Sequence, residues 1–447
     1  MPSRTATLFA CTACGHQTPK WMGRCTACGE WNSLVEEVVE QRPRLVGVPG
    51  AASSVVALRD VESAAAHRIS TGSVELDRVL GGGLVGGSVV LVGGEPGVGK
   101  SSLLLQALGS IAAAGGRTLL VSGEESPAQV RLRAERLGVV DGISILPETE
   151  LETVCEVIRR EKPDVCVVDS VQTLFSSELT SAAGSVAQVR EAADRLARLA
   201  KREGVTVILV GHVTKEGTVA GPRVLEHLVD AVLQFEGDLY RFLRVLRAVK
   251  NRFGSTNEIG IFEMTDAGLR AVADPSAAFS AGAVASPGSV LLPAIEGTRP
   301  ILLEIQALVA PTDLAMPRRS ETGFERTRLS MLVAVLGRHA GVALGSSDVF
   351  VNVAGGVRID EPAADLAVAV AVVSAHRGVT LRPGFGCFGE IGLTGRLRAV
   401  GQTERRLEEA AKLGIRELVV PEGTDSVRGM KLTQAETVEA ALQAVFA

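Results

Sequence analysis

The chain of 447 residues is about three times as long as a typical domain of ~150 residues, so its length predicts two to four domains. With 46% hydrophobic and 22% charged residues, its composition excludes a disordered chain and a disulfide-stapled mini-protein. The formal net charge of −5 means that any nucleic-acid binding must rely on local basic patches rather than on an overall basic surface.

No apolar run in the sequence reaches the ~18 to 20 residues that a membrane-spanning helix needs. The longest such run, Leu366 to Ala375, has about half that length. The amino terminus runs into a cysteine pair without the long apolar core of a signal peptide. We therefore expect a cytoplasmic protein that does not act at a membrane.

Four cysteines near the amino terminus form two C-x2-C pairs separated by ten residues: Cys11, Cys14, Cys25 and Cys28. A glycine follows each pair, Gly15 and Gly29, and permits a tight turn around a metal ion. This spacing predicts a structural zinc ribbon over residues 1–34, in which four protein ligands leave no position open for catalysis. Redox dithiols are the alternative, but the segment is too short for a thioredoxin-like context. Trp21 and Trp31 either pack on this module or offer a contact surface.

Two segments rich in Pro, Gly, Ser and Ala, residues 35–66 and 274–289, predict linkers. Between them, residues 67–273 alternate short β-branched runs with helical segments, which is typical of a mostly parallel sheet covered by helices. Residues 290–447 mix strand-like and Ala-rich helical segments and predict a separate α+β domain. The expected strands of the first sheet are SVVLVGG (88–94), RTLLVSG (117–123), DVCVVDS (164–170), VTVILVGH (205–212) and DAVLQFEG (230–237).

A glycine-rich loop follows the first of these strands and precedes a helical segment. It matches the pattern G-x-x-x-x-G-K-[ST] in Gly94, Glu95, Pro96, Gly97, Val98, Gly99, Lys100 and Ser101, with Ser102 next. In such a loop the backbone N–H groups approach phosphates, the lysine reaches the β- and γ-phosphates, and the hydroxyl ligates Mg²⁺. The strand and helix around the pattern argue against a chance glycine turn, so we expect Lys100 and Ser101 to bind MgATP.

Acidic and imidazole side chains follow three other strands at the edge where the loop lies. Asp169 ends the strand DVCVVDS, where a carboxylate can hold Mg²⁺, although a helix-capping role is the alternative. Glu124 and Glu125 follow RTLLVSG, and one of them can polarise the attacking water, with Glu124 preferred. His212 closes VTVILVGH, where it suits either contact with a γ-phosphate or a structural role.

Several motifs together resemble one family. The cysteine ribbon, GGEPGVGKSS, VVDSVQT and KNRFG are similar to the bacterial RadA family, also called Sms, of DNA-repair ATPases; the pentapeptide comprises Lys250, Asn251, Arg252, Phe253 and Gly254. The match covers essentially the whole chain, and KNRFG behind such a core is specific to this family. The resemblance implies an α/β fold with a RecA-like P-loop ATPase core, an amino-terminal zinc ribbon and a carboxyl-terminal α+β domain.

The resemblance also implies an activity. In the family, RecA-like cores assemble into a hexameric ring resembling DnaB helicases, and ATP hydrolysis drives branch migration of recombination intermediates. We therefore expect a DNA-dependent ATPase and helicase in DNA repair that acts with the RecA recombinase on single-stranded and branched DNA. The expected cofactors are ATP, Mg²⁺ and Zn²⁺.

Two sets of basic residues receive roles from the resemblance. Lys250 and Arg252 are expected to reach an ATP bound by the neighbouring subunit, while Phe253 and Gly254 shape the turn; incidental basic residues in a β-turn are the alternative. DNA is expected at loops 176–187 and 213–223. There Lys215 and Arg223 are candidate phosphate contacts, with a solvated loop as the alternative.

The carboxyl-terminal domain resembles the proteolytic domain of Lon, since GEIGLTGRLRAVGQTERRLEEA is similar to a segment that carries the catalytic lysine. Ala363 occupies the position of the Lon serine, and Glu404 occupies that of the Lon lysine. Because the nucleophile and the base are both missing, we expect that the domain is not an active peptidase. The family implies an assembly and DNA-binding platform instead. Its candidate phosphate contacts, which also suit a solvated charged face, are Arg326, Arg328, Arg396, Arg398, Arg405 and Arg406.

Two other classes of function compete with the DNA motor. A regulatory RecA-like ATPase would turn over nucleotide to switch an assembly, but a zinc ribbon and a Lon-like domain fit that class less well. An ATP-dependent protease is suggested by the similarity to Lon and contradicted by Ala363 and Glu404.

Overall fold

The computed structural model describes residues 5–11, 17–26, 29–40, 68–212, 224–237, 243–280, 285–427 and 429–446. The chain divides into two compact units: Met1–Thr256 with Phe262–Ala271, and Asn257–Ile261 with Val272–Ala447. Among the helices that the structure describes, none has both the length and the apolar character needed to cross a membrane.

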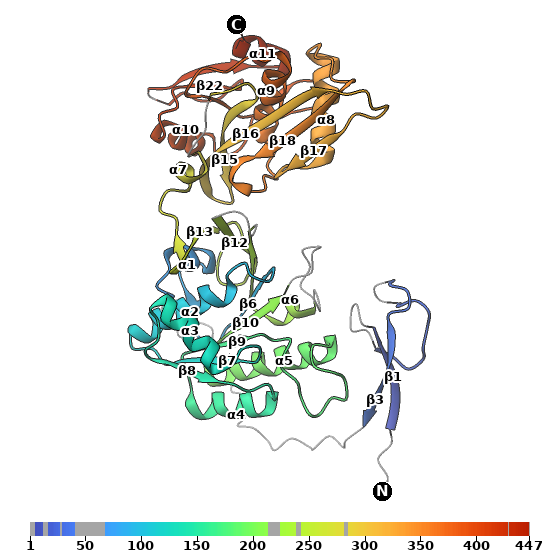
Figure 1. Ribbon diagram of the computed structural model, residues 1–447, viewed down its shortest axis with the longest axis vertical. Helices are drawn as coiled ribbons and strands as arrows, with labels where there is room; N and C mark the ends of the chain where they lie inside the picture. Colours follow the sequence, from blue (N-terminus) through green and yellow to red (C-terminus); the bar gives the residue numbers. More distant parts are fainter. Residues whose placement is uncertain are drawn as a thin grey trace, which may run out of the picture. The chain divides into compact units, whose positions relative to one another are not determined.

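The amino-terminal ribbon is a small antiparallel sheet, drawn in blue in Figure 1. Its strand order is β2-β1-β3, with β1 (Thr5–Cys11), β2 (Gln17–Thr18) and β3 (Leu34–Glu40). Cys11 pairs across the sheet with Leu34, and these two side chains and Cys25 form a buried cluster. The interior of so small a module is therefore built partly from its cysteines.

The core of the first unit is a nine-stranded sheet whose central part is parallel, as the alternating β-branched and helical segments predict. From β11 to β8 all neighbouring strands are parallel, while β11 and β12 pair antiparallel. In spatial order the strands are β14 (Gly268–Ala271), β13 (Ile259–Thr265), β12 (Leu243–Asn251), β11 (Ala231–Glu236), β6 (Val89–Gly94), β10 (Thr206–His212), β9 (Val165–Asp169), β7 (Thr118–Ser122) and β8 (Ile143–Leu146).

Helices cover both faces of this sheet (Figure 1). Alternation along β6 explains the two layers, because Val90 and Val92 pack with α1, α2 and α3, whereas Val89 and Leu91 pack with α4, α5 and α6. The helices are α1 (Val74–Leu80), α2 (Lys100–Ala113), α3 (Pro127–Leu137), α4 (Leu151–Glu161), α5 (Val186–Glu203) and α6 (Val224–Leu228). A short antiparallel pair of β4 (Arg68–Ile69) and β5 (Leu84–Val85), with α1 between its strands, precedes β6.

The second unit contains a mixed seven-stranded sheet. Its strands, in spatial order, are β17 (Arg319–Thr322), β18 (Ser347–Val353), β16 (Arg299–Pro311), β15 (Ser289–Glu296), β19 (Phe385–Cys387), β22 (Glu417–Pro421) and β23 (Lys431–Ala435). A separate pair is formed by β20 (Glu390–Ile391) and β21 (Leu397–Arg398). The helical segments are α7 (Pro275–Ser280), α8 (Arg326–His339), η3 (Ala354–Gly356), α9 (Ala364–Arg377), α10 (Thr403–Lys412) and α11 (Val438–Phe446).

Helix α9 is the buried centre of this unit. Every residue from Ala364 to Ser374 is buried, so the apolar run in the sequence forms a core helix. Its one carboxylate, Asp365, accepts two hydrogen bonds of 2.5 Å from the guanidinium of Arg328 and one from the backbone N–H of Ile391. These bonds allow a charge to lie inside the core.

The segment 274–289 contains structure that its composition does not indicate. Helix α7 lies within it, and the buried hydroxyl of Ser276 donates to Glu409 and accepts from the N–H of Leu302, at 3.0 Å in the second case. Phe279 is also buried. A Ser- and Ala-rich stretch is compatible with a linker and with a short packed helix, and here α7 packs on β16.

Candidate functional site

The phosphate-binding pattern forms the connection between β6 and α2. Lys100 is the first residue of α2, and the preceding Gly99 adopts a left-handed conformation with φ +115°. A side chain at Gly99 would place its Cβ 2.8 Å from Cε of Met264, and one at Gly94 would place it 2.6 Å from the carbonyl oxygen of Phe235. Glycine is therefore favoured at Gly99 by the left-handed backbone conformation, and at Gly94 by the close approach of a neighbouring backbone.

The side chain of Lys100 is buried beneath this loop. Its ammonium donates to the carbonyl oxygens of Gly94, at 2.7 Å, and Glu95, at 3.0 Å. Burial lowers the pKa of Lys100, while the nearby charges of Asp169 and Glu124 act in the opposite direction. The cation is thus fixed next to the loop whose N–H groups can receive phosphates.

Asp169 ends β9 beside the first turn of α2, and its carboxylate is hydrogen-bonded to the hydroxyl of Ser101. Burial raises the pKa of Asp169; the Ser101 bond opposes this and Glu124 adds to it. A hydroxyl and a carboxylate are oxygen ligands of the kind that Mg²⁺ prefers. The pair therefore fits this ion, and the position of Asp169 at a strand end facing α2 favours the metal-binding interpretation over helix capping.

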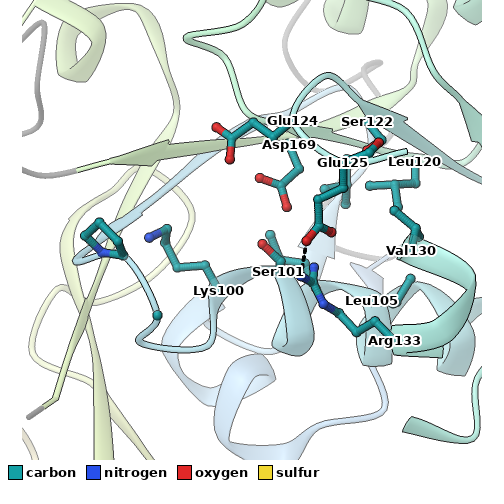
Figure 2. Close-up of a pocket in the computed structure, with 14 residues that line it drawn as sticks. Lys100, Ser101, Leu105, Leu120, Ser122, Glu124, Glu125, Val130, Arg133 and Asp169 are labelled. Carbon is teal, nitrogen blue, oxygen red and sulfur yellow. Dashed lines mark hydrogen bonds and ion pairs between the residues drawn. The ribbon is translucent and has the colours of Figure 1, made fainter. Parts of the chain in front are cut away.

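Two adjacent glutamates have different surroundings in the same cavity, which measures about 230 Å³ (Figure 2). Glu124 is exposed and accepts a hydrogen bond from the hydroxyl of Ser170. Glu125 instead forms an ion pair of 2.5 Å with the guanidinium of Arg133. Because Glu125 is engaged by a cation, the geometry favours Glu124 as the carboxylate that acts on water, in line with the sequence-based preference.

Two further residues of the site received no role in the sequence analysis, although Ser170 lies within the motif VVDSVQT. Ser170 is the residue after Asp169, and Arg133 lies on α3, eight residues after Glu125. The spacing of Arg133 is recognisable only once α3 is known to begin at Pro127. His212 is the last residue of β10 and pairs in parallel register with Gly94, which places its backbone at the phosphate loop.

The pentapeptide KNRFG begins at the end of β12 and is held by backbone contacts. The ammonium of Lys250 donates to the carbonyl oxygens of Glu226, at 2.6 Å, and Val229, at 2.8 Å, around the end of α6. Burial lowers the pKa of Lys250, and the adjacent Arg252 has the same effect. Lys250 thus stabilises the carboxyl-terminal end of α6 within its own subunit.

Arg252 forms an ion pair although about half of its side chain is exposed. Its guanidinium lies 3.2 Å from the buried carboxylate of Asp230, yet 53% of the side chain is exposed. The other oxygen of Asp230 accepts the N–H of Val89, at 3.0 Å, at the start of β6. One buried carboxylate therefore links Arg252 to the strand that leads into the phosphate loop.

The remaining residues of the pentapeptide fix its turn against α1. The amide of Asn251 donates to the carbonyl oxygen of Val79, at 3.2 Å, and its own oxygen accepts the N–H of Phe253, at 2.9 Å. A Cβ on Gly254 would lie 3.0 Å from Cα of Gly81. The close approach of two backbones accounts for the glycine, and the pentapeptide consists of the end of β12 and the ordered turn that follows it.

In the zinc ribbon, Cys11 and Cys25 are buried, whereas Cys14 and Cys28 lie outside the described residues. Trp21 is 56% exposed and Trp31 is 67% exposed, so neither is packed in the ribbon interior. The guanidinium of Arg24 lies over the Trp31 ring, 5.8 Å from its centroid. This exposure favours the contact-surface interpretation of the tryptophans.

The candidate DNA contacts fall into three groups. Lys215 and Arg223 lie outside the described residues. The exposed candidates are Arg326, at the start of α8, and Arg396, Arg398 and Arg405. Arg328 is committed to the buried Asp365, and Arg406 is buried with an ion pair of 2.5 Å to Glu361. Because both arginines are bound to acidic partners inside the domain, the structure assigns them internal roles. The sequence alone does not show which arginines have such partners.

The loop that precedes α5 is held by hydrogen bonds. The amide of Gln188 bonds the backbone of Ser176 and Ser181, and Arg195 forms an ion pair with Glu178. Residues 176–187 contain no Lys or Arg. Contact with DNA phosphates at this loop would therefore depend on backbone N–H groups and hydroxyls.

The two positions aligned with the Lon nucleophile and base carry no such chemistry. Ala363 is buried immediately before α9, and Glu404 is exposed in the first turn of α10. Neither side chain can act as a serine nucleophile or a lysine base.

Comparisons with known proteins agree with this architecture. Family models described as an AAA domain, a rubredoxin metal binding domain and the subunit ChlI of Mg-chelatase match residues 56–218, 9–36 and 320–424. The DNA repair protein RadA of Pseudomonas aeruginosa is 50% identical over 98% of both chains, and that of Bacillus subtilis is 45% identical over 99% of both. The chain belongs to the RadA family of DNA repair proteins. RadA of Aquifex aeolicus is 46% identical over 99% of this chain and 100% of its own.

Membership of the RadA family confirms the resemblance and the fold class. The first unit is a RecA-like ATPase core with an amino-terminal zinc ribbon, and the chain is a DNA repair ATPase. ATP and Mg²⁺ are the cofactors of the core, and Zn²⁺ is that of the ribbon. The oxygen donors and the buried lysine of the cavity fit the first two, and the buried cysteines fit the third.

Proposed function

We propose that this RadA-family ATPase is a DNA motor of the branch-migration helicase type. It forms a ring of identical subunits, a hexamer, in the cytoplasm and acts with the RecA recombinase on single-stranded and branched DNA. The proposal assigns residues 1–34 and the rest of β3 to the zinc ribbon, 67–273 to the motor, and 290–447 with the packed helix α7 to a Lon-like platform. Candidate phosphate contacts are Lys215, Arg223 and the exposed Arg326.

Within one subunit, the residues around the cavity have separate roles in ATP hydrolysis. The amides of loop 94–99 and the ammonium of Lys100 bind the β- and γ-phosphates. Ser101 and Asp169 hold Mg²⁺, which neutralises developing charge on phosphate oxygens when bound. Glu124 orients the attacking water, and His212 contacts the γ-phosphate at the end of β10.

The location of KNRFG is the observation that supports a ring of subunits. The residues that line the cavity, all among those the structure describes, include none of the pentapeptide. Arg252 is nevertheless half-exposed and cationic, and its guanidinium is positioned by Asp230. A positioned arginine outside its own nucleotide site is suited to complete the site of a neighbour, where it stabilises charge in the transition state.

Steady-state ATP hydrolysis with and without single-stranded DNA tests the motor. We expect DNA to raise kcat several-fold, because a motor couples hydrolysis to its track, and Lys100→Ala to abolish activity in both conditions. Branch migration of RecA-made intermediates should require the same lysine. Hydrolysis that DNA leaves unchanged would contradict the motor and favour a regulatory ATPase.

The ribbon is the proposed contact with RecA, because its two tryptophans are exposed and offer an apolar surface to a partner protein. We expect Cys28→Ser to lose zinc, measured as bound metal per chain, and to lose stimulation by RecA while keeping ATP hydrolysis. Trp31→Ala is the matched variant, since it should keep zinc and still weaken RecA binding. Full RecA coupling by a zinc-free Cys28→Ser protein would remove the ribbon from this role.

A further inference from the structure

The nucleotide cavity contains a cation that the functional roles above do not use. Arg133 lines the cavity together with Ser101 and Asp169, and its side chain is 24% exposed. Its guanidinium forms the 2.5 Å ion pair with Glu125. Figure 2 shows the Glu125 carboxylate directed at Arg133, while the Glu124 carboxylate points away from this pair. The charges of Arg133 and Glu125 also act on the nearby Asp169.

Local structure fixes both partners of this pair. Helix α3 begins with a capping box between Ser126 and Gln129, which sets the direction of the helix directly after the glutamates. The hydroxyl of Ser122 donates to the carbonyl oxygen of Glu125, at 2.7 Å. Val130 is buried, and Arg133, one turn later, shares its face of α3. The guanidinium therefore reaches the cavity from a rigid element.

A neighbouring arginine on the same helix has a different environment. Arg131 forms an i,i+4 ion pair with Glu135 at 2.7 Å, and both side chains are largely exposed. Such surface pairs contribute little to stability. Arg131 therefore provides a matched reference for a change of charge on α3 that does not touch the cavity.

Of the residues that the structure describes, Lys100 and Arg133 are the two basic ones that line the cavity. Three carboxylates, from Glu124, Glu125 and Asp169, line the same space, and Lys100 is directed at the loop carbonyls. An unrestrained Glu125 would be free to compete for the metal and to repel the γ-phosphate. The ion pair removes that freedom, because a charge-assisted contact to a guanidinium is strongly directional.

We propose that Arg133 is a positioning residue of the ATP-hydrolysis site: by holding Glu125 in an ion pair, it leaves Glu124 as the carboxylate that faces the attacking water. This inference rests on the roles proposed above for Glu124 and Asp169. It concerns contacts within one subunit and does not depend on DNA. It assigns different functions to two glutamates that are adjacent in the sequence.

A double-mutant cycle on DNA-independent ATP hydrolysis tests the inference. We expect Arg133→Gln to lower kcat about 10-fold and to raise the Mg²⁺ concentration for half-maximal rate about 10-fold, because Glu125 is released. Glu125→Gln should stay within about 3-fold of the wild type, and the double variant Glu125→Gln/Arg133→Gln should match Glu125→Gln alone. Arg133→Lys, which keeps the charge, should retain intermediate activity.

The controls separate positioning from a general effect on folding. Arg131→Gln should leave both kinetic parameters unchanged, and thermal unfolding of all variants should be compared. If Arg133→Gln costs as much in the Glu125→Gln background as in the wild type, or if it has wild-type kinetics, the inference is overturned. An active Glu124→Gln with an inactive Glu125→Gln would instead overturn the proposed role of Glu124 and the inference together.

Discussion

A mixture of Lys100→Ala and Arg252→Ala subunits is expected to hydrolyse ATP, although each variant alone does not. Lys100 belongs to the phosphate loop of one subunit, and Arg252 is proposed to act on the nucleotide of the next. A trans-acting arginine typically contributes about 10³-fold or more to kcat, so each pure ring should be inactive. In equal mixtures about a quarter of the interfaces combine an intact loop with an intact arginine, if subunits assort randomly in a head-to-tail ring.

The matched control for this experiment combines two variants of the same half-site. Mixtures of Lys100→Ala and Asp169→Asn subunits should remain inactive, because every intact loop lysine then faces a carboxamide in its own subunit. Subunit exchange must be shown first, by native mass or by fluorescence transfer between labelled subunits. Mixed rings of Lys100→Ala and Arg252→Ala without recovered activity would show that Arg252 does not act on a neighbour.

The contacts of Lys250 and Arg252 separate two cations that the sequence presents as equivalent. Lys250 is bound to two carbonyl oxygens at α6, and reaching a neighbour would require breaking both bonds. Arg252 needs to release only one ion pair with Asp230, which then keeps the N–H of Val89. The energetic cost of a conformational change therefore favours Arg252 as the group that moves.

The parallel core and the phosphate loop could be predicted because their signals are local. Consecutive β-branched residues define β6, β9 and β10, and a glycine pattern between a strand and a helix has one common structural meaning. The carboxyl ends of parallel strands lie at one edge of the sheet, so Asp169 and Glu124 could be placed near the loop. In the structure both side chains line the same cavity as Lys100.

The residues that sequence reasoning missed depend on long-range packing. Asp230 has no motif, and its importance follows only from hydrogen bonds to Val89, 141 residues away, and to Arg252. In the same way, Arg328 resembles a surface cation until its partner Asp365, 37 residues away, is seen in the core. Breaking a buried pair of the Arg328–Asp365 kind typically costs about 3 to 5 kcal/mol, which explains why a charged residue can be structural.

Replacing Glu124 by glutamine is expected to lower kcat by about 10² to 10³-fold with little change in ATP affinity. The amide keeps the size of the side chain and can still bond the hydroxyl of Ser170, which the carboxylate contacts in the structure. What it loses is the basic oxygen that orients and polarises the attacking water. The loop amides, Lys100 and Ser101 still bind the phosphates, so a fluorescent ATP analogue should bind with its normal Kd.

Glu125→Gln is the matched control, because it changes the neighbouring carboxylate by the same single group. In the wild type the carboxylate of Glu125 is engaged by Arg133 rather than directed at the phosphates. The activity of Glu125→Gln should therefore remain within about 3-fold of the wild type. Single-turnover hydrolysis distinguishes the chemical step from product release, and the defect of Glu124→Gln should be present in that step. Equal losses in both variants would mean that the two glutamates act as one unit, contrary to their separate environments in the cavity.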